Sequence, residues 1–332
     1  MTTLIALNTR DALIMGCDSL GTVTRRLIDP FDLTEYFEDD GDFNIKLDEQ
    51  GQPLLSDFSK ISGKAQHVPY NHMTHVDKLF PLEPLQMAVM SAGEAAIGDR
   101  TIKNLVGEFK TTDGFLASTQ GTSYTLRSVG RKLLRFMWNY YYREYPDERR
   151  RPELELMLGG YDKRKPTPCV TRIHVHENQI EDTDYEFGVF FGGQMKEVQR
   201  IVFGTDFENK IALVERVYEL LERYRSLLSQ QLADAGIQAQ LKPPQEFGDE
   251  LFLFNEWRLN EMDASWGTFS EQNAIECVDF LVNIMIKSQQ FCSQMPTVGG
   301  AVQIGVIKKT SGFTFVSRRE WRHGDYAVPV KE

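Results

Sequence analysis

The sequence is poor in the residues that build disulfide frameworks and metal centres. Of its 332 residues, only 4 are cysteine and 6 are histidine. No C-x-x-C pair occurs, because the cysteines lie far apart at Cys17, Cys169, Cys277 and Cys292. Without an export signal, we expect them to be reduced core residues. His72 and His75 have a metal-ligand spacing only on a helix and lack a third partner, so no metal site is expected. His174 and His176 alternate on a predicted strand, and we expect them on a solvent face.

Long apolar runs and clustered positive charge are also missing. No segment reaches the roughly 18 consecutive apolar residues of a membrane span, and the first residues lack the basic and apolar regions of a signal peptide. The formal net charge of −11 argues against nucleic acid or an anionic membrane as the main partner. The glycine pairs at 159–160 and 299–300 lack the spacing of a phosphate loop. We therefore expect a cytoplasmic protein without a cofactor.

The hydrophobic patterns that are present predict strands and helices in groups. Short apolar runs predict strands at 3–8, 12–17, 85–91, 154–160, 169–175, 188–191, 301–307 and 313–316. Apolar residues at 3- and 4-residue spacing predict helices at about 97–109, 123–142 and 208–235, and from 275 onward. Strands with helices grouped between them fit a layered α+β sandwich of antiparallel sheets better than a doubly wound parallel sheet.

Two stretches look like additions to this pattern. Residues from about 25 to 75 are acidic and show little periodicity, which predicts a long irregular excursion. Residues from about 206 to 270 are largely helical, and an apolar stripe between Leu213 and Leu228 predicts a core or subunit contact. We expect a single domain over residues 1–332, with insertions at about 25–75 and about 206–270.

Thr2 is a candidate nucleophile at the start of the chain. A threonine hydroxyl needs a base, and an N-terminal threonine has one in its own α-amine, a group whose pKa is ordinarily roughly 7.7 to 8.0. Met1 precedes a small residue and is therefore the usual substrate for methionine removal, which would expose that amine. Asp18 and Lys78 are candidates for the charged pair that tunes the amine. Gly93, in the turn after the strand at 85–91, is a candidate oxyanion donor.

In their order along the chain, these residues resemble the proteasome β-subunit and HslV peptidase family of N-terminal nucleophile (Ntn) hydrolases. The resemblance is carried by Thr2-Thr3-Leu4, Gly16-Cys17-Asp18-Ser19, Lys78-Leu79 and Met90-Ser91-Ala92-Gly93. Weaker landmarks follow at 158–162, 191–193 and 298–301. The resemblance implies the Ntn hydrolase fold, a four-layer αββα sandwich of antiparallel sheets, here in a divergent bacterial-type member with helical insertions.

The same resemblance implies a threonine-type endopeptidase. Thr2 would attack peptide bonds through an acyl-enzyme, supported by Asp18 and Lys78, and the N–H of Gly93 would line the oxyanion hole. Ser91 would lie at the wall of the first specificity pocket. Backbone bonds to an extended peptide are implied at Thr22, Gly93 and Ala95. The implied partners are a peptide or unfolded protein substrate and further copies of the chain in a ring or helical assembly, and an unfoldase partner is allowed.

The sequence departs from this family at two places. The serines usual around the glycine turn at 192–193 are replaced by Gly192 and Gln194, and the acidic residue usual before 299–300 is missing from 294–298. Gln194, Thr297 or water would have to take over proton shuttling and amine positioning. Two alternatives therefore stay open: a catalytically weak or inactive proteasome-like structural subunit, and an Ntn amidase that acts on small amides.

Overall fold

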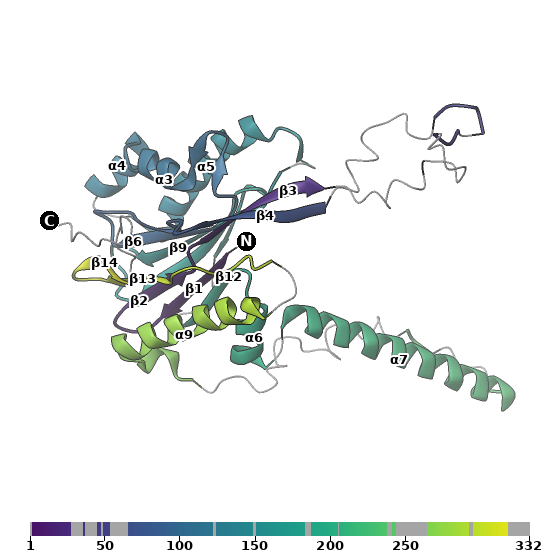
Figure 1. The fold of residues 1–332 in the computed structure, drawn as a ribbon. Helices are drawn as coiled ribbons and strands as arrows, with labels where there is room; N and C mark the ends of the chain where they lie inside the picture. The colour runs from purple at the N-terminus through teal and green to yellow at the C-terminus, as the bar shows by residue number, and fades with distance from the viewer. Residues whose placement is uncertain are drawn as a thin grey trace.

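The computed structural model describes most of the chain, and the statements below concern only the part that it describes (Figure 1). Most of 28–65, within the first predicted insertion, and 244–263, within the second, lie outside it. The described residues are 2–27, 36, 45–47, 49–53, 66–121, 124–148, 151–182, 187–204, 206–237, 241–243, 264–291 and 295–317.

One antiparallel sheet, the first sheet, is built around the start of the chain. Its strand order is β12-β1-β2-β13-β14. β1 and β2 form the predicted hairpin, whose turn is held because the Thr9 N–H donates to the Ala12 carbonyl and the Ala12 N–H donates to Thr9 Oγ1. The strands are β1 (Thr3–Asn8), β2 (Leu13–Cys17), β12 (Gly188–Gly193), β13 (Gln303–Lys308) and β14 (Gly312–Ser317).

A second antiparallel sheet faces the first one. Its order is β11-β10-β9-β6-β5, and three of its strands, β6, β9 and β10, lie where sequence patterns placed them. The short β5 and β11 were not predicted from such patterns, because three or four residues give too little alternation to identify a strand. The strands are β5 (Leu79–Pro81), β6 (Met87–Gly93), β9 (Leu154–Tyr161), β10 (Pro168–His174) and β11 (Gln179–Asp182).

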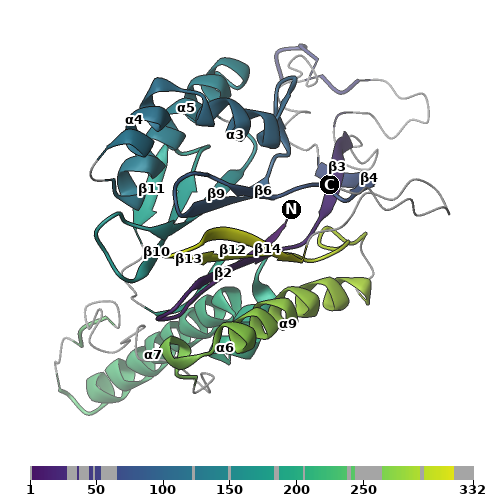
Figure 2. The ribbon, with the colours of Figure 1, turned by 90° about the vertical axis from the view of Figure 1, so that its left-hand side faces the viewer.

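Helices cover the outer face of each sheet (Figures 1 and 2). α3 (Ile102–Lys110), α4 (Asp113–Gln120) and α5 (Leu126–Glu144) lie on the second sheet, each with a threonine N-cap. α6 (Lys196–Phe203) and α9 (Glu271–Gln290) lie on the first sheet. α3 begins later than predicted, because β7 (Ala96–Ile97) and β8 (Arg100–Thr101) form a small hairpin before it.

Three buried hydrophobic clusters account for this arrangement. One joins the second sheet to α3, α4 and α5, and another joins the first sheet to α6 and α9. The third lies between the two sheets and includes Leu4, Ala6, Met90, Ala92 and Met157. The predicted mixture of helices with antiparallel sheets is therefore confirmed.

The first predicted insertion is more regular at its ends than expected. β3 (Leu20–Leu27) and β4 (Gln66–Thr74) form a two-stranded antiparallel ribbon that projects from the sheets (Figure 1). The irregular stretch predicted from about 25 to 75 is therefore wrong at both ends. A two-stranded ribbon has no broad face that must be buried, so its sequence lacks the alternation that identifies a strand.

The second predicted insertion contains α7 (Phe207–Asp234), which begins and ends within one residue of the predicted bounds. Asp206 caps it by accepting a hydrogen bond from the Asn209 N–H. α7 extends away from the sheets, and the apolar side chains of Leu220, Tyr224 and Leu227 on it are more than half exposed (Figure 1). In the part of the chain that the structure describes, no helix is long and apolar enough to cross a membrane.

Candidate active site

Asp18, directly after β2, is a fully buried carboxylate. Its Oδ1 accepts the Thr3 N–H at 3.1 Å, and its Oδ2 accepts the N–H groups of Leu20 and Gly299 at 3.1 and 3.0 Å. Three backbone donors therefore hold the carboxylate in a fixed position. Asp18 joins the first residues of β1 to the glycine turn at 299–300.

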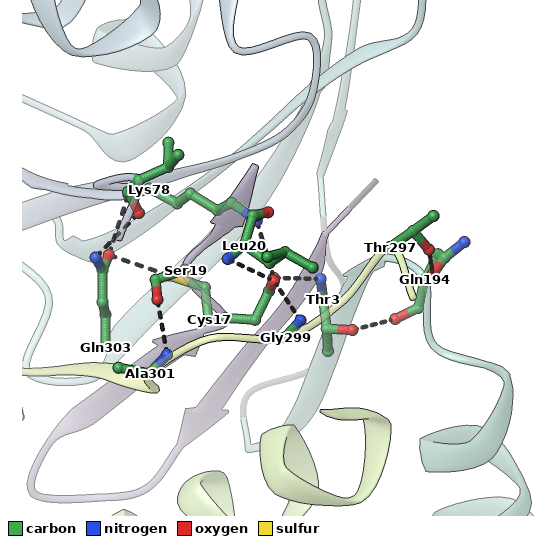
Figure 3. Close-up of polar contacts among 12 residues, drawn as sticks. Thr3, Cys17, Ser19, Leu20, Lys78, Gln194, Thr297, Gly299, Ala301 and Gln303 are labelled. Carbon is green, nitrogen blue, oxygen red and sulfur yellow. Dashed lines mark hydrogen bonds and ion pairs between the residues drawn. The ribbon is translucent and has the colours of Figure 1, made fainter. Parts of the chain in front are cut away.

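Lys78 lies directly before β5 and reaches across to Asp18 (Figure 3). Its Nζ is 3.1 Å from each Asp18 carboxylate oxygen and 2.6 Å from the Leu20 carbonyl oxygen. The Lys78 side chain is 6% exposed, and that of Asp18 is 0% exposed. The structure thus brings together the two charged residues that the sequence analysis paired, although 60 residues separate them.

Gln303 on β13 holds the backbone of Lys78. Its Oε1 accepts the Lys78 N–H at 3.0 Å, and its Nε2 donates to the Val76 carbonyl at 3.1 Å. Cys17 also donates to Gln303 Oε1, at 3.7 Å. Burial raises the pKa of the Cys17 thiol strongly, so this cysteine stays protonated and is no candidate nucleophile.

Thr2 is buried beside this pair, between β2 on one side and β12 on the other. The Gln194 N–H donates to the Thr2 carbonyl at 2.7 Å, and Thr3 Oγ1 donates to the Gln194 carbonyl at 2.8 Å. Leu4 and Ala6 lie in the cluster between the sheets, so alternation along β1 places the Thr2 side chain on that same face.

The Gln194 side chain belongs to a neutral network of three residues. Its Oε1 accepts hydrogen bonds from Gln289 Nε2 and Thr297 Oγ1, both at 2.9 Å. Gln289 Oε1 in turn accepts the Thr297 N–H at 2.8 Å. The two residues named as replacements for the missing serine and acid, Gln194 and Thr297, therefore contact each other directly (Figure 3). Gln289, near the end of α9, was missed by the sequence analysis, which treated that helix only as core.

Glu155 on β9 is a second group that the sequence did not reveal. Its Oε2 accepts the Gly193 N–H at 3.0 Å. Glu155 pairs in register with Ala92 on β6, and a Cβ on Gly193 would lie 3.2 Å from the Ala92 Cβ. The carboxylate therefore lies at Gly193, the residue whose Cβ position is in contact with the Thr2 carbonyl. The sequence signal that could have indicated Glu155 is a glutamate within an otherwise apolar predicted strand.

Gly93 ends β6 with a φ of +93°, and its neighbour Ala92 lies against Gly193. The Glu94 N–H donates to the Glu153 carbonyl, and the Ser91 N–H donates to the Lys78 carbonyl, both at 3.0 Å. Since backbone groups alternate between the two edges of a strand, the Gly93 N–H faces away from β9. Ser91 is buried, and the same alternation turns its side chain toward the helices.

The remaining predicted residues lie on the two segments that flank this turn. Thr22 is on β3, two residues beyond the carbonyl that Lys78 binds, and pairs with His72 on β4. The other edge of β3 carries no strand in the described part of the chain. Ala95 is exposed, and its carbonyl accepts the Ile102 N–H at 3.0 Å.

Together these positions place a threonine, a buried ion pair, an oriented glycine N–H and a second carboxylate around the first residues of β1. A hydroxyl here can be activated by a nearby amine, and developing negative charge can be met by a backbone donor. Among the described residues, no group of three or more His, Cys, Asp or Glu side chains could hold a metal ion.

Comparison with known proteins gives likenesses among solved structures only. No protein-family model matches this chain, and no curated protein is similar to it in sequence. The solved structures with a similar fold include an Anbu (Gly-1) mutant from Hyphomicrobium sp. strain MC1, with a TM-score of 0.48 and 10% sequence identity over 96% of this chain and 88% of that chain. A likeness of this degree carries no functional information.

Proposed function

We propose that this chain is a threonine-dependent peptidase of the proteasome and HslV type, with Thr2 as its nucleophile once Met1 is removed. The observation that carries the proposal is the buried Asp18–Lys78 pair, which binds the Thr3 N–H directly beside Thr2. A buried ion pair is costly to maintain, because its attraction only partly offsets the loss of water. The cost of a buried pair at this position is explained if Asp18 and Lys78 tune the amine and hydroxyl of Thr2.

In this proposal the Thr2 α-amine takes the proton of Oγ1 as the oxygen attacks a peptide carbonyl. The Gly93 N–H donates to the oxyanion, the amine returns the proton to the leaving nitrogen, and an acyl-enzyme forms. Water then attacks the ester and releases Thr2. Thr22 and Ala95 bind the extended substrate through their backbones, and Ser91 lies at the wall of its first side-chain pocket.

The proposal extends to the architecture and the assembly. The two facing sheets with helices on both outer sides fit the four-layer αββα sandwich of Ntn hydrolases, and we assign residues 1–332 to one such domain with insertions at about 25–75 and about 206–270. The exposed apolar side chains of α7, Leu220, Tyr224 and Leu227, support a homo-oligomer. We propose that this assembly is cytoplasmic. An unfolded protein would be the substrate, and an unfoldase is the kind of partner that would deliver it.

The first test is the intact mass of the purified protein, followed by reaction with a threonine-directed epoxyketone or β-lactone. We expect a mass without Met1 and one covalent adduct, which Thr2→Ala abolishes and the neighbouring control Thr3→Ala retains. A folded protein that keeps Met1 overturns the proposal. A processed, folded protein that gives no adduct supports instead the inactive structural subunit, which the neutral Gln194–Thr297 contact favours. Turnover of small amides but not of unfolded protein would identify an amidase.

A further inference from the structure

Two polar groups near Thr2 are left without partners within the described part of the chain. Glu155 Oε1 is buried and accepts no hydrogen bond. The Thr2 carbonyl accepts the Gln194 N–H, so these two residues form a hydrogen-bonded pair in which the Thr2 nitrogen also faces β12. No described backbone carbonyl outside the strand ladders accepts a hydrogen bond from that nitrogen. A buried carboxylate oxygen without a donor is costly, and an amine is the donor that it lacks.

The two groups lie on opposite sides of the same glycine pair. Glu155 Oε2 binds the Gly193 N–H at 3.0 Å, and a Cβ on Gly192 would lie 2.8 Å from Glu155 Oε1. A Cβ on Gly193 would lie 2.0 Å from the Thr2 carbonyl oxygen. Because both glycines lack a side chain, no side chain of this pair stands between the carboxylate and the first residue of the processed chain.

We propose that Glu155 is a positioning residue whose Oε1 binds the α-ammonium of Thr2 in the chain that lacks Met1. The inference rests on the proposed function, because that function requires a free amine. Removal of Met1 converts a peptide N–H into an ammonium with three donors and a positive charge. Glu155 then fixes the direction of the amine relative to Thr2 Oγ1, while Asp18 fixes the adjoining Thr3 N–H.

The charges around the amine determine the expected effect. Asp18 and Lys78 form a pair on the β2 and β5 side. Glu155 comes from β9, and its register partner His174 on β10 lies 3.4 Å from Glu181 Oε2. The side chains of His174 and His176 are each 23% exposed, so both lie partly open to solvent on this face. The residues of the neighbouring neutral network, Gln194, Gln289 and Thr297, are uncharged. Charged side chains of β10, β11, α6 and α7 line the same hollow as Gly193, Gln194 and Gln289: Arg172, Glu181, Lys196, Glu197 and Glu208.

A carboxylate beside an ammonium stabilises its protonated form, so Glu155 raises the pKa of the Thr2 amine. Replacing Glu155 by Gln keeps an acceptor for the Gly193 N–H but removes the charge. We therefore expect the amine pKa to fall by about 1 unit in Glu155→Gln. Because the amine must be neutral to act as a base, the acid limb of the kcat/KM profile should move to lower pH by the same amount.

The test measures this amine directly. The full chain beginning at Thr2 is prepared by cleavage of an N-terminal fusion, and the pH dependence of reductive methylation of the Thr2 amine is followed by peptide mass spectrometry. We expect the amine pKa to fall in Glu155→Gln, to fall less in Glu155→Asp, and to stay unchanged in Glu153→Gln, which removes an exposed carboxylate just before β9. The Asp variant replaces the Gln variant if the latter does not fold.

The outcomes separate the inference from the proposed function, because methylation needs no turnover. Equal amine pKa values in the wild type and Glu155→Gln overturn the inference even if the enzyme cleaves peptides. A lower value in Glu155→Gln supports it even in a protein that shows no peptidase activity. An equal fall in Glu153→Gln also overturns it, because the effect would then be one of overall charge.

Discussion

The two flanks of Thr2 are built on different physical principles. The Asp18 flank, which comprises Asp18, Lys78 and the Gly299 N–H, joins two full charges that are almost completely buried. The Gln194 flank, which comprises Glu155, Gly193, Gln194, Gln289 and Thr297, consists mainly of neutral amides and a hydroxyl held by single hydrogen bonds.

The difference shows which flank can tolerate change. Each partner of a buried ion pair depends on the other for its solvation, so the Asp18 flank is expected to fail as a unit. Neutral hydrogen bonds contribute about 0.5–1.5 kcal/mol each and are lost singly. The Asp18 flank therefore fixes the start of β1, while the Gln194 flank can adjust the direction of the first residue.

Breaking the ion pair should have the largest effect. Asp18→Asn leaves the Lys78 ammonium buried without a counter-charge, and we expect a loss of about 3–5 kcal/mol in the free energy of unfolding. Urea unfolding at neutral pH measures it. The double variant Asp18→Asn with Lys78→Met removes both charges and should recover part of the loss. A single variant as stable as the wild type would show that the pair is solvated and would remove the contrast between the flanks.

The glycine pair of the Gln194 flank offers a matched comparison. Gly193 has a φ of +65°, and a Cβ there would lie 2.0 Å from the Thr2 carbonyl oxygen. The nearest atom to a Cβ on Gly192 is Glu155 Oε1 at 2.8 Å, the movable end of a side chain. Gly193→Ala should therefore lower the free energy of unfolding by about 1–3 kcal/mol. Gly192→Ala should lower it by less. Thermal unfolding of both variants checks the order, and the reverse order would contradict the geometry described for this turn.

Removing one amide of the neutral network should have a smaller effect. Gln289→Leu deprives the Thr297 N–H and Gln194 Oε1 of a partner, and we expect a cost of about 1–2 kcal/mol. The control is Gln290→Leu, which changes the exposed next residue of α9 and should lie within about 0.5 kcal/mol of the wild type. Equal stabilities of the two variants, measured by urea unfolding, would mean that the network is not formed in solution.

The two flanks also differ in how far the sequence revealed them. Asp18 and Lys78 were proposed as a pair because an N-terminal amine base needs a nearby cation and a carboxylate to hold it, and because the order of these residues along the chain resembles the Ntn hydrolase family. The fold class followed from strands and helices with clear periodicity. The same periodicity placed α7 to within one residue, because its apolar stripe is continuous.

The Gln194 flank could not be predicted to the same extent. Gln194 and Thr297 were suggested only as substitutes, and Gln289 and Glu155 were not suggested at all. Their contacts include one between residues 191 positions apart, and glutamine is common on helices with no role beyond solubility. The ribbon of β3 and β4 was missed for a related reason, since a two-stranded element leaves no alternation in the sequence.

Glu181 lies one residue beyond the Gln194 flank, because it contacts His174, the register partner of Glu155, and this outer end should give the smallest effect. Burial acts to raise the pKa of Glu181 on β11, but the neighbouring Arg172 guanidinium, 2.7 Å away, outweighs it and holds this pKa below its usual value. A lowered carboxyl pKa stabilises the folded state above the unfolded value of roughly 4.3, and this stabilisation is lost as the pH falls through the folded value. Because the Glu181 side chain is 50% exposed, Glu181→Gln should cost less than about 1 kcal/mol at pH 7. Unfolding free energies of the two proteins should converge as the pH is lowered below about 4. A difference in unfolding free energy that does not change with pH would show that the Glu181 side chain acts through packing. Glu181 would then resemble the neutral network, and not a weak, exposed version of the Asp18–Lys78 pair.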